Sequence, residues 1–404
     1  MRINKILMIA IFILLSKNSS IADISIPYGE GAGKVDYINS SKISKPEKIE
    51  KLDEKEEEKI IKELEEEEKE IAKENTDEPE EVEPEEEEQP ELEPNDEQED
   101  DVIPSGPLSF RIVGDNTWVA DSIGGKLIQF DNKGKLISEF SILPEGIKAY
   151  EKDEDGFPIS NIFIEDMAPV LGDYGAIKAW WIADSNTNLL IKFSSNGKPL
   201  ALLSDPGFSH LSRVEVGPSG HLFVADDGNK KIYIYDSDGN MINEQHWEDS
   251  GMAVAGQNDY LYRLIYFNEE KKYMLVTTDV KGKVIKSKAL DAEMNEPKLW
   301  WVDEVKEEAV ITYTPITANE NELEKEEIAD IKAAELDSSK ISNEEFEIVR
   351  VGFDGKVKAK GKVSAPSLMN RFIEHANYEE VYVGKCNYFE APKGNFEIVP
   401  FKMP

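Results

Sequence analysis

A pattern of apolar and polar positions repeats along the C-terminal three quarters of the chain. In residues 117–134, 179–197 and 221–239 an apolar run ends in Ala-Asp, a short polar turn follows, and an alternating apolar segment leads to a turn closed by Gly. The closing glycines mark five units, at Gly134, Gly197, Gly239, Gly282 and Gly355. Self-similarity at a nearly constant period indicates that one supersecondary unit is built several times.

Each unit is predicted to form four short antiparallel strands. In the third unit they fall at 212–216, 221–225, 231–236 and 240–245. A sheet of this size cannot bury both of its faces alone, whereas radial stacking of several such sheets can. Six units can be counted, which predicts an all-β, six-bladed β-propeller over residues 102–404. The spacing of the glycines lengthens twice, which places insertions near 143–178 and 316–345.

The sixth unit is one strand short at the C-terminal end. Propellers are often closed by a strand from the other end of the chain, which then completes the last sheet. Two candidates precede the first unit: the acidic, proline-containing residues just before Leu108, and the apolar ISIPY at 24–28. We hypothesise that residues 24–28 close the ring, because the first candidate has poor strand composition.

The unit at 220–239 resembles the NHL repeat. The family pattern falls on Gly220, Val224-Ala225-Asp226, Asn229, Lys231 and Gly239, with Lys where the family usually has Arg. The resemblance is clear in about three units, over residues 117–239. It implies a six-bladed propeller and a broad choice of functions: protein-binding scaffolds, RNA-binding domains, and enzymes such as lactonases and amidating lyases.

The N-terminal quarter has a different composition. Residues 1–22 combine Arg2 and Lys5 with an apolar run and then small residues, which predicts a cleaved signal peptide; an uncleaved membrane anchor is the alternative. A short apolar, glycine-containing segment follows at 23–45. We therefore expect an exported protein, periplasmic or extracellular, with no integral membrane span after cleavage.

An acidic segment separates this region from the repeats. Residues 47–101 contain 30 acidic residues and seven lysines, which is most of the chain's net charge of −37. Within the predicted tether at 46–101, residues 46–74 favour a partly formed helix, whereas prolines and like charges at 75–101 favour an extended, disordered chain. Such a chain repels polyanions, so nucleic acid is excluded as a partner.

Two kinds of repeated residue are expected to be architectural. Asp121, Asp184 and Asp226 end an apolar strand in three units, where a buried carboxylate can satisfy backbone N–H groups of the following turn. The pairs Trp180-Trp181 and Trp300-Trp301 put indoles on both faces of a strand, and both faces are buried between blades. We interpret them as core, with a ligand platform as the alternative.

A weaker ligand-binding candidate lies in the predicted innermost strands. Arg111, Arg213 and Arg371 all fall in such segments, and His210 precedes one of them. Arginines that converge on the axis can bind a carboxylate or a phosphate; ion pairs with neighbouring acids are the alternative. The four histidines have no metal-ligand spacing and no phosphate loop is present, so we expect no metal, no cofactor and no catalytic residue.

These observations favour a non-enzymatic, protein-binding scaffold of the bacterial envelope. Its expected partner is a protein of that envelope. A single cysteine, Cys386, forbids an intramolecular disulfide, and the chain is expected to be monomeric. The alternatives are a propeller enzyme, a lactonase-like hydrolase or a lyase with an axial site, and a purely structural envelope component.

Overall fold

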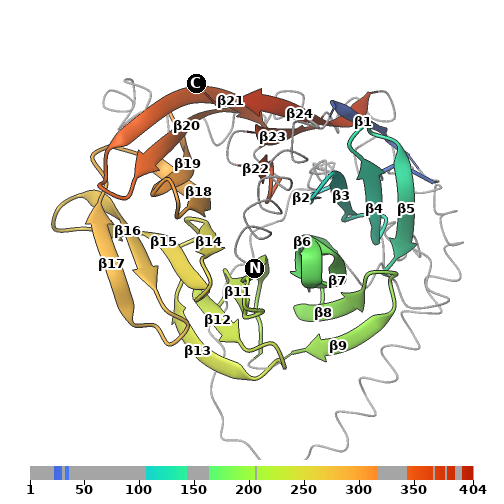
Figure 1. Ribbon diagram of the computed structural model, residues 1–404, viewed down its shortest axis with the longest axis horizontal. Coiled ribbons are helices and arrows are strands. Elements are labelled where there is room, and N and C mark those ends of the chain that lie inside the picture. Colours follow the sequence, from blue (N-terminus) through green and yellow to red (C-terminus); the bar gives the residue numbers. More distant parts are fainter. Residues whose placement is uncertain are drawn as a thin grey trace, which may run out of the picture.

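Six four-stranded sheets surround a central axis (Figure 1). The computed structural model describes residues 22–29, 32–35, 106–142, 163–204, 207–315, 344–366, 369–377, 380–386 and 394–403. Every neighbouring pair of strands is antiparallel, and the first strand of each sheet lies nearest the axis. The chain is a six-bladed β-propeller, and the predicted all-β architecture is confirmed.

The first three blades follow one another along the chain, each from the axis to the rim. Blade 1 contains β2 (Ser109–Val113), β3 (Asn116–Asp121), β4 (Lys126–Asp131) and β5 (Leu136–Ser141). Blade 2 contains β6 (Ile164–Leu171), β7 (Ile177–Asp184), β8 (Leu189–Ser194) and β9 (Pro199–Leu203), with the 3-10 turn η1 (Asp173–Gly175) between its first two strands. Blade 3 contains β10 (Leu211–Val216), β11 (Leu222–Asp226), β12 (Lys231–Tyr235) and β13 (Met241–His246).

The next three blades complete the ring. Blade 4 contains β14 (Met252–Ala255), β15 (Tyr260–Phe267), β16 (Lys272–Thr278) and β17 (Val284–Ala289). Blade 5 contains β18 (Asn295–Asp303), β19 (Glu308–Thr314), β20 (Glu344–Gly352) and β21 (Val357–Ala365). Blade 6 contains β22 (Ile373–Asn377), β23 (Glu380–Lys385) and β24 (Asn395–Lys402), and its fourth strand is β1 (Ile24–Pro27).

The expected insertion at 143–178 differs from what the structure shows. Residues 164–171 form β6, the innermost strand of blade 2, and η1 and the start of β7 follow within the same range. The sequence hid this strand because Pro169 and the acidic pair Glu165-Asp166 interrupt its apolar pattern. The predicted signal peptide up to residue 21, the tether at 46–101 and residues 316–343 of the second expected insertion lie outside the described residues.

The strand β1 closes the ring, which confirms the hypothesis for residues 24–28. It pairs antiparallel with β24, Ile24 opposite Ile398 and Ile26 opposite Phe396. Both isoleucines are buried in the core cluster that blades 1, 5 and 6 share, while Ser25 between them is exposed. The propeller therefore includes a strand from outside the predicted range 102–404.

The turn glycines lie between the third and fourth strands of blades 1 to 5. Gly134, Gly197, Gly239, Gly282 and Gly355 all have φ between 76° and 89°, a region that favours glycine. A Cβ on Gly355 would lie 2.3 Å from the carbonyl oxygen of Ala289 in the preceding blade. These turns therefore need glycine for backbone conformation and, in this blade, for close packing against its neighbour.

Large aromatic side chains fill the space between blades. The ring centroids of Trp118 in blade 1 and Trp180 in blade 2 lie 5.0 Å apart, and Trp300 in blade 5 meets Phe372 next to blade 6 at 4.6 Å. All four residues of the two tryptophan pairs are buried. Among the described residues no helix is long and apolar enough to span a membrane.

We predict that Ile26→Ala weakens the closed ring. The change removes a fully buried side chain from the strand that completes the last blade, so the free energy of unfolding should fall by about 2–5 kcal/mol. Ser25→Ala, on the exposed face of the same strand, is the control and should change it by less than about 0.5 kcal/mol. Urea unfolding of the full chain measures both, and equal stability of the two variants would contradict the closing role of β1.

Candidate functional site

The axis of the propeller is crossed by a network of charged side chains from four blades. Its centre is Asp166 on β6, which is fully buried and which sequence analysis had placed in an insertion. Arg371 forms a two-pronged ion pair with it, Nε to Oδ1 at 3.0 Å and Nη2 to Oδ2 at 2.8 Å. Ser109 Oγ and the backbone N–H of Val214 also donate to this carboxylate, at 2.7 and 3.1 Å. Asp166 thus links blades 1, 2, 3 and 6.

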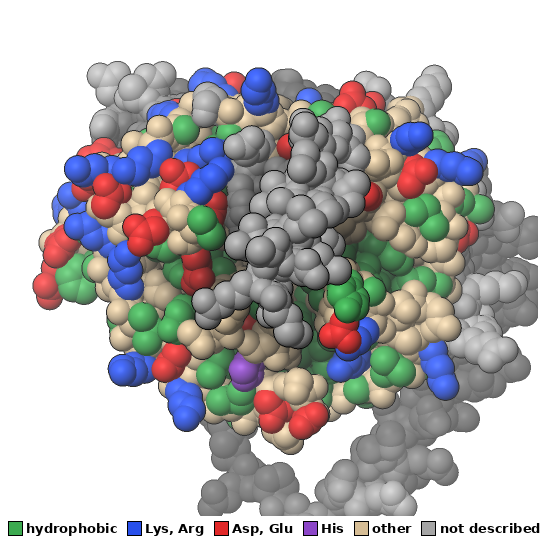
Figure 2. Space-filling model, viewed as in Figure 1, with side chains coloured by type: hydrophobic (Ala, Val, Ile, Leu, Met, Phe, Trp, Pro, Cys, Tyr) green, Lys and Arg blue, Asp and Glu red, His purple; other side chains and the backbone are tan. Residues whose placement is uncertain are grey.

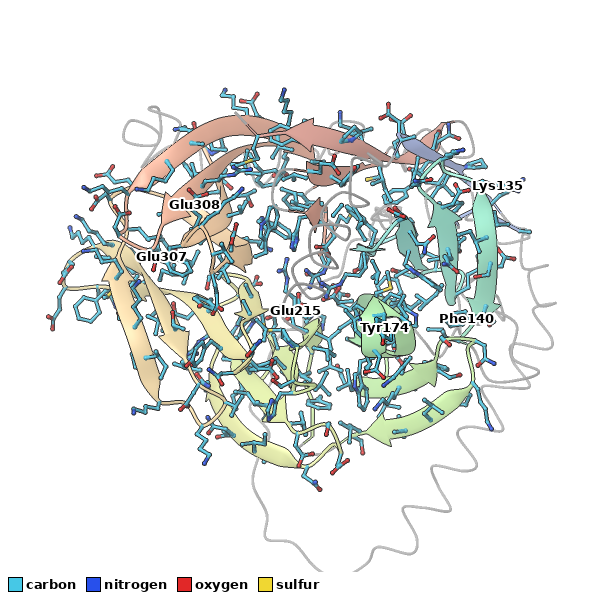
Figure 3. All side chains as sticks on the ribbon, viewed as in Figure 1. Lys135, Phe140, Tyr174, Glu215, Glu307 and Glu308 are labelled. Carbon is cyan, nitrogen blue, oxygen red and sulfur yellow. The ribbon has the colours of Figure 1, made fainter. Side chains whose placement is uncertain are left out.

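Arg111 forms the second half of this network. Its Nη1 lies 3.1 Å from Glu215 and 3.3 Å from Glu374, and its other nitrogens donate to backbone carbonyls. Glu215, which also accepts from Arg371 at 2.8 Å, lies beside the axis (Figure 3). Arg111 and Arg371 are therefore occupied by acids of this chain, which is the ion-pairing alternative to ligand binding.

Arg213 lies nearby but differs from the other two arginines. Its guanidinium stacks on Trp300 at 4.5 Å, and its Nη2 donates to the carbonyl of Asn370 at 3.0 Å. Its Nη1 is buried and has no hydrogen-bond partner among the described residues. Burial and the charge of Arg371 lower the pKa of Arg213 to about 10. Among the described residues, Arg213 is thus the one of these three arginines with a buried guanidinium nitrogen that lacks a hydrogen-bond partner.

His210 does not join the arginines. It is exposed at the start of blade 3, and in the described part of the chain its ring makes no hydrogen bond to the axial side chains. Its backbone makes two hydrogen bonds within blade 3: the N–H donates to Asp226 at 3.0 Å, and the carbonyl accepts from the N–H of Asp227. The structure therefore brings three of the four candidate residues to the axis and leaves His210 on the surface.

The repeated aspartates lie where the strands meet their turns. Asp226 accepts from the N–H groups of Ser209, His210 and Asn229, and Asp184 accepts from those of Phe163 and Asn186. Asp121 accepts from Gly124 N–H at 2.9 Å. Each carboxylate thus accepts from backbone N–H groups of its own blade's turn. Asp184 and Asp226 also accept from N–H groups of the segment that leads into the blade. Asp303 does the same in blade 5, and the ending of its strand in Val-Asp was the signal.

The electrostatics of the network follow from burial and pairing. Burial alone would raise the pKa of Asp166, but the charges of Arg371 and Arg111 hold it well below its ordinary value. Glu374 is likewise lowered, to a pKa of about 2, against the effect of burial, by a hydrogen bond from His375 and by Arg111 and Arg371. Three carboxylates and three guanidinium groups meet here, so the core of the axis is neutral and structural.

Glu165 is the residue whose chemistry sequence analysis missed. Burial raises its pKa to about 7, and the charges of Asp166 and Asp227 add to the rise. A carboxyl group with such a pKa can give or accept a proton near neutral pH. It follows Ile164 in the strand that was taken for an insertion, so no repeat position pointed to it. Among the described residues no group of histidine, cysteine or acidic side chains is arranged to hold a metal ion.

Comparisons with known proteins agree with the fold and go no further. No protein-family model matches the chain, and no curated protein sequence matches it. The resemblance to the NHL repeat therefore stays a prediction.

Many solved structures are similar in shape. Hydrazine synthase from Kuenenia stuttgartiensis matches with 11% identity and a TM-score of 0.42 over 69% of this chain and 74% of that one. Virginiamycin B lyase from Staphylococcus aureus matches with 13% identity and a TM-score of 0.40 over 72% and 80%, and the Dos1 propeller with 10% and 0.39 over 69% and 66%. At these identities and scores, the likeness carries no argument about activity.

We predict that Asp166→Asn destabilises the propeller strongly. The change removes the fully buried carboxylate that pairs with two nitrogens of Arg371, so about 3–5 kcal/mol of unfolding free energy should be lost. The double variant Asp166→Asn with Arg371→Met removes the uncompensated charge and should recover part of that loss. Chemical unfolding at neutral pH measures both, and an Asp166→Asn protein as stable as the unaltered chain would contradict the role of the network.

The raised pKa of Glu165 predicts a pH dependence. Between its ordinary pKa of 4.5 and about 7, the carboxyl is ionised in the unfolded chain but protonated in the folded one. The unfolded state then binds fewer protons, so this group lowers stability as pH rises through that window. Glu165→Gln should flatten the curve between pH 5 and 7 and be more stable at pH 8. Glu397→Gln, which changes an exposed acid, is the control. The free energy of unfolding is measured between pH 5 and 8, and the same dependence on pH in both variants would contradict this assignment.

Proposed function

We propose that the chain is a non-enzymatic protein-binding scaffold, exported to the bacterial envelope, which binds its partner at the rim of blades 2 to 4. The proposal rests on what the outer strands expose. Three consecutive blades each present two large aliphatic side chains there, between 36% and 56% exposed: Leu200, Leu202, Met241, Ile242, Val284 and Ile285. Exposed apolar side chains that gather on one part of the surface are typical of interaction sites on soluble proteins.

The same strands offer open edges. β9, β13 and β17 are each the last strand of their sheet, so their outward N–H and C=O groups have no strand partner among the described residues. Such an edge accepts an extended segment of another chain, whose backbone supplies the hydrogen bonds. The partner that fits is therefore a protein with an extended, aliphatic segment.

The closing strand shows how such an addition works on this fold. β1 approaches from a distant part of the sequence and pairs with β24 through four residues, burying two isoleucines against the sheet. Aliphatic side chains at alternate positions thus fix an added strand at the rim. Leu200 and Leu202 on β9 have this same alternate spacing.

The surface charges fit a protein partner better than a polyanion. Around the described rim, Lys and Arg side chains stand among Asp and Glu side chains on the face shown in Figure 2. Several are paired across strands, including Lys231 with Glu244 at 2.9 Å and Lys360 with Glu347 at 2.6 Å. We propose that the acidic residues 46–101 act as a tether and that residues 1–22 direct export, because their composition fits these roles.

The enzyme alternative draws on one observation. Glu165, with a pKa near 7, and the open Nη1 of Arg213 both lie toward the axis, and together they offer a proton donor and an anion partner. A lactonase-like hydrolase or a lyase needs such groups. The scaffold is favoured because the other axial charges are paired with each other. A purely structural envelope component is the third candidate. Capture of a partner that binds reversibly, in the test below, would exclude it.

We predict that the double change Leu200→Ser and Leu202→Ser abolishes partner binding without unfolding the chain. Both side chains are exposed, so stability should change by less than about 1 kcal/mol, while the partner loses its apolar contact. The measurement is capture of envelope proteins by the full chain, followed by affinity measurement with the purified partner. Val305→Ser, at a still more exposed position in a turn of blade 5, is the control. A partner that binds the double variant as tightly as the Val305→Ser protein would contradict the rim site.

A further inference from the structure

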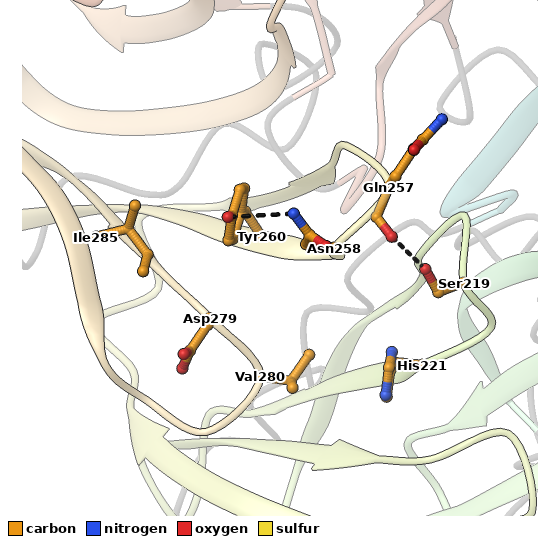
Figure 4. Close-up of a pocket in the computed structure, with 8 residues that line it drawn as sticks. All are labelled: Ser219, His221, Gln257, Asn258, Tyr260, Asp279, Val280 and Ile285. Atoms are coloured by element: carbon orange, nitrogen blue, oxygen red, sulfur yellow. Dashed lines mark hydrogen bonds between the residues drawn. The ribbon is translucent and has the colours of Figure 1, made fainter.

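A second site lies between blades 3 and 4, away from both the axis and the outer aliphatic residues of β9 and β13. It is an open pocket of about 480 Å³ formed where the hairpins of the two blades meet (Figure 4). Ser219 and His221 come from blade 3, and the other lining side chains, among them Asn258, Tyr260 and Asp279, come from blade 4. The pocket is therefore built by the packing of two repeats, and neither blade contains it alone.

The wall of the pocket is anchored by a buried carboxylate. Asp259 is fully buried, and its φ of 51° places it in the left-handed region. It reaches across to blade 3, where it accepts from the backbone N–H groups of Ser219 and His221 and lies 2.8 Å from His221 Nδ1. A Cβ on Gly217 would lie 2.3 Å from this carboxyl carbon, so only glycine allows the approach.

This anchor sets the orientation and the neutral tautomer of the histidine. An ionised carboxylate only accepts hydrogen bonds, so Nδ1 of His221 must carry the hydrogen that bridges to Asp259. In the neutral ring, Nε2 is then an acceptor with no partner among the described residues. The side chain is 27% exposed, and the ring lines the pocket (Figure 4). The histidine therefore offers an oriented acceptor to whatever enters.

A carboxylate oxygen in the same pocket is also open. Oδ1 of Asp279 accepts from the N–H groups of Lys281 and Lys283, as an aspartate at the start of this turn does. The equivalent residue of blade 3, Asp236, uses its Oδ1 in the same way, but its Oδ2 accepts from Asn240 Nδ2 at 2.9 Å. Oδ2 of Asp279 has no such partner among the described residues. The turn of blade 4 therefore has an available carboxylate oxygen, whereas the equivalent oxygen in blade 3 accepts a hydrogen bond from Asn240.

The remaining polar groups of the pocket also offer hydrogen-bond acceptors. Asn258 Nδ2 donates to Tyr260 Oη at 3.2 Å, which leaves the amide oxygen of Asn258 as an acceptor. Ser219 Oγ donates to the carbonyl of Gln257 at 2.6 Å, so its lone pairs are available. No lysine or arginine side chain lines the pocket. Its open groups are mostly acceptors, with one formal negative charge at Asp279 and the aliphatic side chains of Val280 and Ile285 beside it.

We propose that this pocket binds a primary ammonium group. An ammonium carries a positive charge and three hydrogens, and Asp279 Oδ2 offers it an acceptor of opposite charge. His221 and Asn258, on other walls of the same pocket, offer acceptors to further polar groups of the ligand. Its alkyl chain would lie against Val280 and Ile285, and the ring of Tyr260 adds a face that attracts cations. The ligand is either a free alkylamine or the side chain of a lysine in a polypeptide. The pocket shares Ile285 with the rim proposed above, but none of its polar groups belongs to that rim.

Calorimetric titration of the full chain tests this with two probes, n-butylamine and the peptide acetyl-Gly-Gly-Lys-Gly-Gly-amide. At least one should bind, and Asp279→Asn should weaken it about tenfold or more, because the amide keeps the turn's acceptor but removes the charge. Asp236→Asn, the same change in the turn of blade 3, is the matched control and should bind like the unaltered chain. Thermal unfolding verifies that both variants are folded.

The relative affinities identify the source of the ligand. A peptide that binds at least tenfold tighter than n-butylamine assigns the pocket to a lysine of a partner protein, and similar affinities assign it to free amines. As a second readout, the ring signals of His221, assigned with a His221→Gln variant, should shift on titration. The proposal is overturned if neither probe binds, if Asp279→Asn binds as well as Asp236→Asn, or if n-butanol binds as tightly as n-butylamine.

Discussion

Four residue pairs between β1 and β24 join the two ends of the propeller's chain. A ring of sheets gains its stability from contacts between neighbours, and the first and last sheets are neighbours only when the last one is complete. The core cluster at this junction holds side chains of β1 together with residues of blades 1, 5 and 6. The axial network depends on this closure as well, because it joins Arg111 of blade 1 to Glu374 of blade 6.

At the axis, the same closure brings opposite charges together. Arg371 precedes the innermost strand of the last blade, and Asp166 lies in the second. Burial would make each charge costly alone, and their pairing makes the cluster neutral. This explains how the protein can bury guanidinium groups at its centre without an external anion, since its own carboxylates neutralise them. Arg213 supplies the third guanidinium of this balance although one of its nitrogens lacks a partner among the described residues, and Glu165, next to Asp166 in the chain, has a raised pKa.

Repetition explains both the regular and the irregular features of the surface. Each of blades 1 to 5 has a glycine turn before its outer strand, and most of them have a strand-ending carboxylate; these features follow the repeat. Where a blade departs from the repeat, chemistry becomes available. Asp279 lacks the side-chain partner that Asp236 has, and Asp259 crosses to the neighbouring blade instead of serving only its own turn. The candidate sites lie at such departures.

The sequence alone determined the propeller and the strands of blade 3, because alternating apolar positions and glycine turns are local signals that hardly depend on context. It also singled out residues 24–28 as a closing strand, from the count of strands. Only the tertiary structure placed Asp166, Glu165 and β6 at the axis, because Pro169 and the neighbouring acids break the local pattern of that strand. The pairing of Arg111 and Arg371 with acids, and the pocket of His221 and Asp279, depend on contacts between residues distant in sequence. No local periodicity encodes which of those charges meet.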